Sequence, residues 1–445
     1  MKKMRRYSIL LAIIAMMALV SASFFPAVRT VAAATASSAE LFTEADMRQA
    51  LAEFIGDGTA ENSRADRTSF RDGERAAAAW LESKLLSLGY KPESGYEDAE
   101  NPLLRPFTYL EEYKSQNVTA VYPSAEENAP QILLTANYDN NYGDIGNLSG
   151  VGGAGALQNG TGVAVLLAIA EALINQSPEL PFSVRFVFFG ASEVGLIGSG
   201  FFLSDQLSAA EREKIALVVG VRRIGVDYSY LYTDEVDTAH GDMFLETSQS
   251  GGYGVVAQPR SVPYIPAEYK EGLPYATWGM LGDQVRFMSR DMNIVSIYGG
   301  NLETMNVADI DGKAGTITYT SNDTLEGLQK YYPDYGKKMA EVAGLIYDTI
   351  NKDDFIQVCL NSAQSRYDYT WLTKPAVVTG ITIGILIVCG IVLVVLVRYF
   401  QKKYPLKPLV RKLKIAVFGM EYERPDEENI FVDVKTNGIP PNPFE

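Results

Sequence analysis

Apolar residues follow helical spacing in some segments of the chain and form short continuous runs in others. The helical spacing predicts helices at residues 44–55, 69–88, 160–174 and 324–350, the last with an interruption near Pro333. The short runs predict strands at residues 117–122, 131–136, 182–189, 216–221 and 294–297. Strands that alternate with helices indicate an α/β fold with a doubly wound, mainly parallel sheet flanked by helices.

Two longer apolar runs lie near the ends of the chain. Four basic residues within positions 2–6 precede an apolar stretch at 7–28, and small residues follow at 32–34. This order is typical of a secretory signal peptide. The stretch is also long enough to span a membrane, so an uncleaved anchor stays open. We therefore assign residues 1–34 to a signal peptide or an N-terminal anchor.

The second run, residues 375–397, has 23 residues without a charge, which predicts a transmembrane helix. Lysines and arginines follow it at once, from Arg398 to Lys414. The positive-inside rule then predicts a single-pass cell-membrane protein with a cytoplasmic C-terminus. The expected parts are an ectodomain at 40–352, a juxtamembrane segment at 353–374 and a basic segment with an acidic tail at 398–445.

Charge and rare residues exclude several classes of function. The chain carries 39 lysines and arginines against 54 aspartates and glutamates, a net charge of −15, which argues against nucleic-acid binding. Cys389 lies in the second apolar run, so Cys359 has no partner for a disulfide in the ectodomain. His240 is the single histidine, although most hydrolytic zinc sites and catalytic triads use at least one.

His240 lies in a polar stretch, residues 237–242, that we interpret as a surface loop. An ordinary surface histidine is the simpler interpretation. The alternative is a metal ligand together with Asp237 and Asp242, whose carboxylates could also hold calcium.

Four segments carry motifs in a fixed order. They are Ile-Leu-Leu-Thr-Ala-Asn-Tyr-Asp at 132–139, Gly-Ala-Leu-Gln-Asn-Gly-Thr-Gly at 155–162, a strand followed by Ala-Ser-Glu-Val-Gly-Leu-Ile-Gly-Ser at 186–199, and Tyr-Thr-Ser-Asn-Asp-Thr at 319–324. A weaker fifth match is Gly-Asp-Gln at 282–284. Together they resemble the secreted di-zinc aminopeptidases related to bacterial leucyl aminopeptidase, aminopeptidase Y and glutaminyl cyclase, over residues 67–350.

The resemblance implies a site for two zinc ions, held by carboxylates and imidazoles, with a glutamate as general base. In this chain the first histidine position is Asn137, the bridging aspartate position is Gln158 and the general-base position is Ser192. The next aspartate ligand falls at Arg222, within one residue of register, and the last histidine falls at Tyr319. Glu193 keeps a ligand position, and Asp139 keeps the outer aspartate of the first motif.

These substitutions remove the chemistry of the family. Asparagine and glutamine lack charge, and Ser192 cannot act as a carboxylate base. One carboxylate cannot hold a catalytic zinc, which usually takes three protein ligands. We therefore expect no cofactor and no catalysis. Arg222 could supply a cation for Glu193 and Asp139, or Arg222 or Arg223 could instead point into solvent.

Three functions remain open. The first is a binding or scaffolding ectodomain whose old cleft, rimmed by Tyr138, Tyr142 and the glycine-rich loop 150–155, takes a peptide or a protein partner. Gly380 and Gly384 have a spacing that suits a membrane subunit or a dimer. The second is an enzyme, either a metallo-aminopeptidase with an atypical metal site or a hydrolase or acyltransferase based on Ser192, although no Gly-x-Ser-x-Gly elbow surrounds that serine. The third is a sensor that signals through its acidic tail.

Overall fold

The computed structural model describes residues 38–56, 63–97, 99–140, 153–233, 238–258, 282–300, 317–318 and 320–366. Gly390, Val392 and Leu396 are the described residues beyond these, and all three are helical. Contacts divide the chain into two units, residues 1–366 and 367–445. The predicted signal or anchor, the rest of the predicted transmembrane helix and the expected cytoplasmic segment lie outside the described residues.

One eight-stranded sheet forms the centre of the first unit, with the strand order β1-β2-β4-β3-β5-β8-β6-β7. The neighbouring pairs β4–β3, β3–β5 and β5–β8 are parallel. Its strands are β1 Leu104–Tyr109, β2 Tyr113–Tyr122, β3 Gln131–Asn137, β4 Ser183–Phe189, β5 Ile215–Arg222, β6 Tyr228–Tyr232, β7 Val255–Ala257 and β8 Ile294–Gly300.

The sheet is mixed: four of its seven pairs of neighbouring strands are parallel, the fourth being β6–β7, so the expected parallel pairing holds at its centre and antiparallel pairs lie toward its edges. β1 pairs with β2, β2 with β4, and β6 with β8 in antiparallel fashion. Three strands, β1, β6 and β7, were not predicted. β1 contains a proline and an arginine, and β6 is rich in tyrosine, so neither forms the apolar run that marked the central strands. β1 and β7 are the edge strands and β6 lies beside β7. Strands that are not covered on both faces lack the continuous apolar run by which buried strands are recognised.

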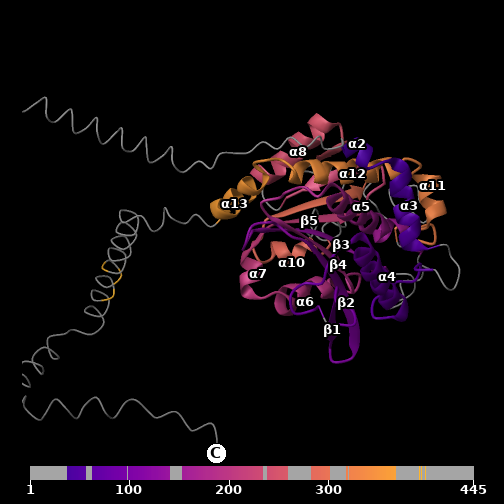
Figure 1. Cartoon of the computed structure of the whole chain (residues 1–445), viewed down its shortest axis with the longest axis horizontal. Helices are drawn as coiled ribbons and strands as arrows, with labels where there is room; N and C mark the ends of the chain where they lie inside the picture. Colours follow the sequence, from indigo (N-terminus) through magenta and orange to yellow (C-terminus); the bar gives the residue numbers. More distant parts are fainter. Residues whose placement is uncertain are drawn as a thin grey trace, which may run out of the picture. The chain divides into compact units, whose positions relative to one another are not determined.

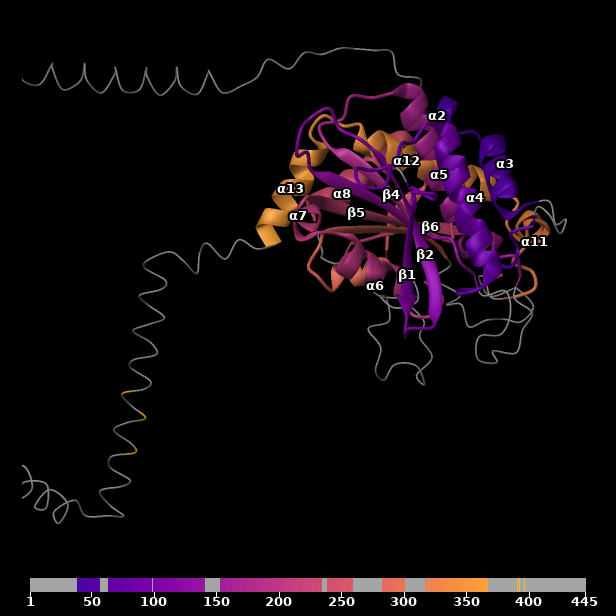
Figure 2. The same cartoon turned by 60° about the horizontal axis from the view of Figure 1, so that its bottom comes forward.

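Helices cover both faces of the sheet (Figures 1 and 2). The larger core packs one face against α3, α4, α5, α8, α12 and α13, and a smaller core packs the other face against η2 and α10. The helices are α2 Ser38–Leu41, α3 Glu44–Ile55, α4 Asp72–Leu88, η1 Ala156–Gly160, α5 Thr161–Gln176, α6 Ile197–Phe201, η2 Phe202–Gln206, α7 Ala209–Glu213, α8 Ala239–Gly251, α10 Gln284–Met288, α11 Leu325–Tyr331, α12 Tyr335–Ile350 and α13 Phe355–Arg366.

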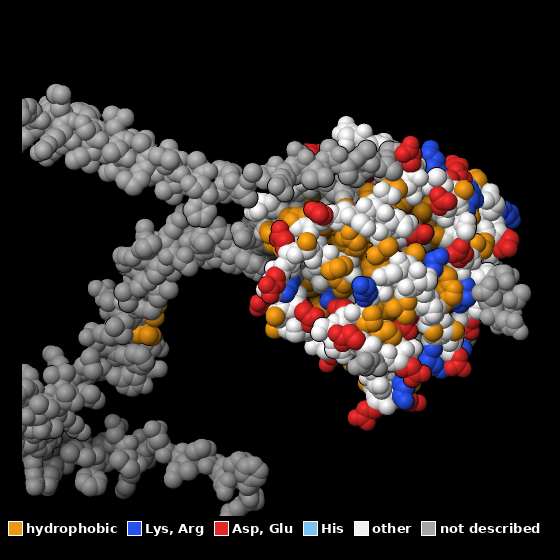
Figure 3. Space-filling model, in the orientation of Figure 1, with side chains coloured by type: hydrophobic (Ala, Val, Ile, Leu, Met, Phe, Trp, Pro, Cys, Tyr) orange, Lys and Arg blue, Asp and Glu red, His pale blue; other side chains and the backbone are white. Residues whose placement is uncertain are grey.

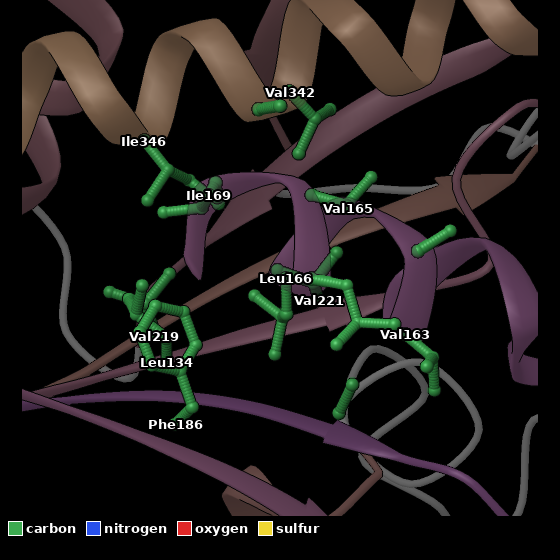
Figure 4. Packing of buried hydrophobic residues seen from close by; sticks show 14 of the residues in the cluster. Leu134, Val163, Val165, Leu166, Ile169, Phe186, Val219, Val221, Val342 and Ile346 are labelled. Atoms are coloured by element: carbon green, nitrogen blue, oxygen red, sulfur yellow. The ribbon is translucent and has the colours of Figure 1, made fainter. Parts of the chain in front are cut away.

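The helix α5 lies between the sheet and α12 (Figure 4). Val165 and Ile169 of α5 lie toward Val342 and Ile346 of α12, while Leu166 lies toward the strands. Burial on both sides explains why its apolar pattern is nearly continuous. Among the described residues, the stretch 156–176 is long and apolar enough to cross a membrane, but most of it is buried inside the domain, so it is a core helix.

The last predicted helix is divided as its proline suggested. α11 ends at Tyr331 and α12 begins at Tyr335, with Pro333 between them. A further helix, α13, lies in the stretch that the sequence assigned to a juxtamembrane segment. Phe355 and Cys359 of α13 are fully buried, so the packed domain continues to residue 366.

His240 is not a surface residue, and the expected surface loop is wrong for the described residues 238–242. It lies in the first turn of α8 and its side chain is fully buried. Phe244, one turn later on the same helical face, is buried as well, because α8 packs against α12 and α13. Asp242 is exposed, and Asp237 lies outside the described residues.

Candidate functional site

The positions singled out by the motifs meet at one edge of the sheet. Asn137 ends β3 and Arg222 ends β5, while Glu193 lies shortly after the end of β4. β4, β3 and β5 are parallel neighbours, so their carboxyl ends lie together. Gln158 joins them from η1, the turn that opens α5. This edge is where open α/β sheets place their binding sites.

Glu193 is the centre of the cluster. Its Oε1 accepts a hydrogen bond from Gln158 Nε2 at 2.7 Å and longer ones from Asn137 Nδ2 and Arg222 Nη2, both at 3.4 Å. The side chains of Glu193 and Arg222 are 5% and 12% exposed, so this is a largely buried ion pair. Asn137, Gln158 and Arg222 lie at positions where the family resemblance implies metal ligands. All three side chains donate hydrogen bonds to Glu193, the one ligand carboxylate that is retained.

The sequence had left open that Arg222 or Arg223 points into solvent. Neither does. Arg222 pairs with Glu193, and Arg223 is 9% exposed, with its backbone N–H donating to Asn159 Oδ1.

Asp139 connects the first motif to the third. Its Oδ2 accepts hydrogen bonds from Ser69 Oγ at 2.7 Å and from the Glu193 backbone N–H at 2.9 Å. Burial raises the pKa of Asp139 well above its usual range, and the negative charges of Glu193 and Glu74 add to this. The retained aspartate thus positions the backbone of the retained glutamate.

Ser192, at the general-base position, donates from Oγ to Asp283 Oδ2 at 2.6 Å. Asp283 belongs to the weak fifth motif and is 4% exposed. Burial raises the pKa of Asp283, and the charge of Arg222 opposes that shift. The serine is therefore a hydrogen-bond donor to a buried carboxyl group, and neither its chemistry nor this geometry makes it a base.

Two buried residues hold the loop that carries Gln158. The Asp323 carboxylate, from the fourth motif, accepts the backbone N–H groups of Leu157 at 2.6 Å and Gln158 at 3.3 Å. Arg67, which is fully buried, donates to the carbonyl oxygens of Tyr138 and of three other residues. Those three are Arg64, Ala154 and Gly155.

Burial dominates the titration of both loop-holding groups. It raises the pKa of Asp323 to about 7, against the opposing effects of two backbone donors and of the Arg67 charge. It lowers the pKa of Arg67 to about 10, although Asp323 and Asp139 favour its charged form. The charged form of each group is therefore stabilised by the opposite charge of the other.

The sequence did not identify Arg67, Glu74, Asp283 or Asp323 as site residues. Asp283 and Asp323 lie inside the motifs at 282–284 and 319–324, so the sequence could have identified them as site residues. Glu74 lies at the start of α4 and Arg67 lies in the segment before it. No local pattern sets either residue apart. Both contact segments that are distant in the sequence, Tyr138 for Arg67 and Ala191 for Glu74, so no local pattern could identify them.

Tyr138 does not rim a cleft, which corrects that prediction. Its side chain is fully buried, and its hydroxyl donates to the Gln116 carbonyl oxygen at 2.7 Å. Adjacent residues of an extended chain point to opposite faces, so Tyr138 turns away as Asn137 turns toward the site. Tyr142, residues 150–152 of the glycine-rich loop and Tyr319 lie outside the described residues.

The donor set can be tested against the two zinc ions that the resemblance implies. Zinc takes cysteine, histidine or carboxylate ligands, usually three of them from the protein at a catalytic site. Here two neutral amides and a guanidinium donate to Glu193, the one carboxylate at a ligand position. The Arg222 cation lies 3.4 Å from Glu193 Oε1, and it would repel a metal cation bound there. Among the described residues, this donor set does not fit a zinc centre.

Known proteins that are similar to this chain indicate the family of its domain. The profile of Peptidase family M28 matches residues 117–331. Aminopeptidase YwaD of Bacillus subtilis is 31% identical over 243 residues, which cover 54% of this chain and 46% of that protein. Leucine aminopeptidase 2 of Arthroderma otae is 24% identical over 189 residues, covering 40% and 36%. The chain thus spans less than half the length of these curated relatives.

Among solved structures, a Zn-dependent exopeptidase from Parabacteroides distasonis is similar in fold. Its TM-score is 0.50 at 16% sequence identity, and the similarity covers 72% of this chain and all of that one. At this identity the likeness concerns the fold alone, a mixed α/β sheet with flanking helices. The chain therefore contains a domain of Peptidase family M28, homologous to zinc aminopeptidases.

Proposed function

We propose that this chain is a membrane-anchored, extracytoplasmic relative of the aminopeptidases that does not hydrolyse peptides. In this proposal its domain binds a peptide or protein partner, or acts as a scaffold in a membrane complex. The membrane anchor and the location rest on the apolar run 375–397 and the basic residues after it.

One observation carries the proposal. Arg222 pairs with Glu193 at the edge of the sheet where the family resemblance implies bound zinc. An enzyme that polarises a carbonyl group and activates water with zinc needs an open metal position and a carboxylate base. In this chain the retained ligand is already satisfied by internal donors, and Ser192 stands at the base position.

The surface agrees with a protein or peptide partner. Over the described residues of the face in Figure 3, acidic and basic side chains are interspersed. A nucleic-acid site would need a basic patch, and the net charge of −15 opposes one. A partner that recognises mixed charge and apolar groups suits this surface better.

A second candidate is an active metallo-aminopeptidase with an atypical metal site. The similarity of the chain to aminopeptidase YwaD and leucine aminopeptidase 2 favours it. It would require ligands other than the residues that surround Glu193.

Metal content and activity, measured on one sample, separate the two candidates. The full-length chain would be purified in detergent, incubated with zinc and dialysed, then submitted to elemental analysis and to an assay with leucine p-nitroanilide. We expect less than about 0.1 equivalent of zinc and no turnover, because a working site needs at least one tightly held metal.

The matched control is Glu193→Gln, which removes the single retained ligand carboxylate. If the native chain holds about one or two equivalents of zinc and turns over substrate, and Glu193→Gln loses both, the site is catalytic and the proposal is wrong. If neither protein binds zinc or hydrolyses the substrate, the proposal stands.

A further inference from the structure

A hairpin beside the site carries a cluster of apolar side chains. β1 and β2 pair as antiparallel strands and are joined by residues 110–112, with Tyr109 opposite Tyr113. The ring of Phe70 lies against both tyrosines, with centroid distances of 6.3 Å to Tyr109 and 5.3 Å to Tyr113. Leu110, at the tip, is 68% exposed. We call Phe70, Tyr109, Leu110 and Tyr113 the aromatic ledge.

The aromatic ledge lies at the edge of the sheet that holds the candidate site. Val118 of β2 pairs with Phe188 near the carboxyl end of β4, so residues 113–116 continue past that end. β1 and β2 project from the domain in both views (Figures 1 and 2). The ledge therefore stands beside the loop that carries Glu193.

Hydrogen bonds tie the aromatic ledge to the site. The Phe70 N–H donates to Glu74 Oε2 at 2.7 Å, and Glu74 Oε1 accepts the backbone N–H of Ala191, next to Ser192, also at 2.7 Å. Ser69, the neighbour of Phe70, donates to Asp139. Phe70 is thus held by the same carboxylates that organise the site, and its ring in turn packs against Tyr109 and Tyr113, which suits a preformed binding surface.

Two residues of the aromatic ledge, and the loop residue Glu111, have a strained backbone conformation. Phe70, Leu110 and Glu111 have φ values of 66°, 51° and 62°. Residues with a side chain rarely adopt this left-handed region, and asparagine or glycine would relax it. A strained, exposed leucine at a hairpin tip serves neither the turn nor the core. Strain of this kind gathers at binding and catalytic sites.

Charge near the aromatic ledge indicates what binds it. Glu111 and Glu112 are exposed in the loop itself. Lys114 follows Tyr113 on the strand, so it points to the opposite face of the hairpin. Arg75 near Phe70 is paired with Asp72. The ledge therefore offers apolar faces beside carboxylates, although Arg71 adds one exposed cation beside Phe70.

We propose that the aromatic ledge is the docking surface for a protein partner whose binding segment carries an aromatic or large aliphatic side chain flanked by lysine or arginine. This inference rests on the proposed function as a binding domain. Aromatic anchors are enriched at the centre of protein interfaces, and a polar rim surrounds them. An anionic lipid surface would be repelled by Glu111, Glu112 and the net charge of −15.

The test uses the full-length chain in detergent and labelled synthetic peptides with a central tryptophan flanked by lysines, by glutamates or by glycines. Fluorescence anisotropy measures their affinity. The lysine-flanked peptide should bind at least about tenfold more tightly than the glutamate-flanked one, and less tightly as salt is added. Equal affinities for the two peptides would overturn the proposed chemistry of the partner.

The decisive variant is Leu110→Asn, because asparagine tolerates the left-handed conformation. We expect an unchanged or higher midpoint of thermal unfolding together with at least about tenfold weaker binding of the lysine-flanked peptide. Tyr113→Ser should weaken the same binding. The control is Leu86→Gln, at a leucine on α4 that is 38% exposed, and it should bind normally. Unchanged binding by Leu110→Asn would refute the ledge as the docking surface.

Other outcomes are equally informative. Co-sedimentation with phosphatidylserine vesicles that depends on Leu110 would assign the aromatic ledge to a membrane and overturn the proposal. Failure of peptide binding in a chain without zinc and without turnover would remove the docking surface but leave the non-catalytic function. Turnover with bound zinc would remove that function whatever the peptides do.

Discussion

Arg222 is the residue whose side chain departs furthest from the chemistry that the motifs imply. The resemblance implies an aspartate there, and the structure has a cation whose Nη2 lies 3.4 Å from Glu193 Oε1. A carboxylate that is 5% exposed needs a compensating charge, and a guanidinium supplies one without a metal. Arg222 also opposes the rise in the pKa of Asp283, so one cation acts on two carboxyl groups.

Arg222→Met should lower the free energy of unfolding by roughly 3 kcal/mol, because it removes one partner of a largely buried pair and leaves Glu193 without a cation. Arg222→Lys keeps a charge of similar reach and should lose less. Urea denaturation of the full-length chain, with the native protein beside both variants, measures the difference. An Arg222→Met chain as stable as the native one would show that the pair does not matter to the fold.

One glycine of the third motif allows a helix to lie close to the sheet. Gly198, in α6, lies so close to the end of β4 that an added Cβ would meet the Gly190 carbonyl oxygen at 2.2 Å and Asn117 Oδ1 at 2.5 Å. Two residues later, an added Cβ at Gly200 would meet nothing within 4 Å. Gly198 of the Gly-Leu-x-Gly-Ser pattern therefore serves the approach of α6 to the sheet, and this packing requirement does not depend on a bound metal.

The two glycines form a matched pair for substitution. Gly198→Ala should destabilise the domain by about 1–3 kcal/mol, because the contacts it would meet are backbone and buried side-chain atoms that cannot move away. Gly200→Ala should be neutral or stabilise by up to about 1 kcal/mol, since it adds helix propensity in open space. Denaturant midpoints of both variants check this. Equal effects of the two substitutions would contradict the packing argument.

At the scale of the whole molecule, the domain buries several carboxyl groups near one edge of its sheet. Burial is the largest cause of the raised pKa in each of Glu74, Asp139, Asp283 and Asp323. The pKa reaches about 7 for Glu74 and for Asp323. In the unfolded chain these groups would titrate near 4, so the folded state binds protons that the unfolded state has released.

The free energy of unfolding should therefore fall as pH rises through the interval between those values. For each such group the slope reaches about 1.4 kcal/mol per pH unit between about pH 5 and about pH 7, and it levels off above that. Glu74→Gln should show a shallower slope, and Glu112→Gln, at an exposed position, should not. Urea titrations at a series of pH values test this. Identical slopes for the native chain and Glu74→Gln would refute the linkage.

The local pattern of the sequence was enough to predict the central strands, three of the helices and part of the candidate site. Continuous apolar runs marked the central strands because those strands are covered on both faces, and helical spacing marked α3, α4 and α5. The motifs marked Asn137, Gln158 and Glu193 as neighbours in space, since each lies at the carboxyl end of a strand or the start of the helix beside it. These features are local, so a single sequence carries them.

Tertiary structure decided what depends on contacts between distant segments. The burial of His240 and the inward turn of Tyr138 follow from helix packing and strand pleat, which residue type does not report. The edge strands β1 and β7, and β6 beside β7, carry weak local signals because one face or side of each is less covered. The pairing of Arg222 with Glu193 was open in the sequence, because a shift of one residue in β5 would turn that side chain to the other face of the sheet.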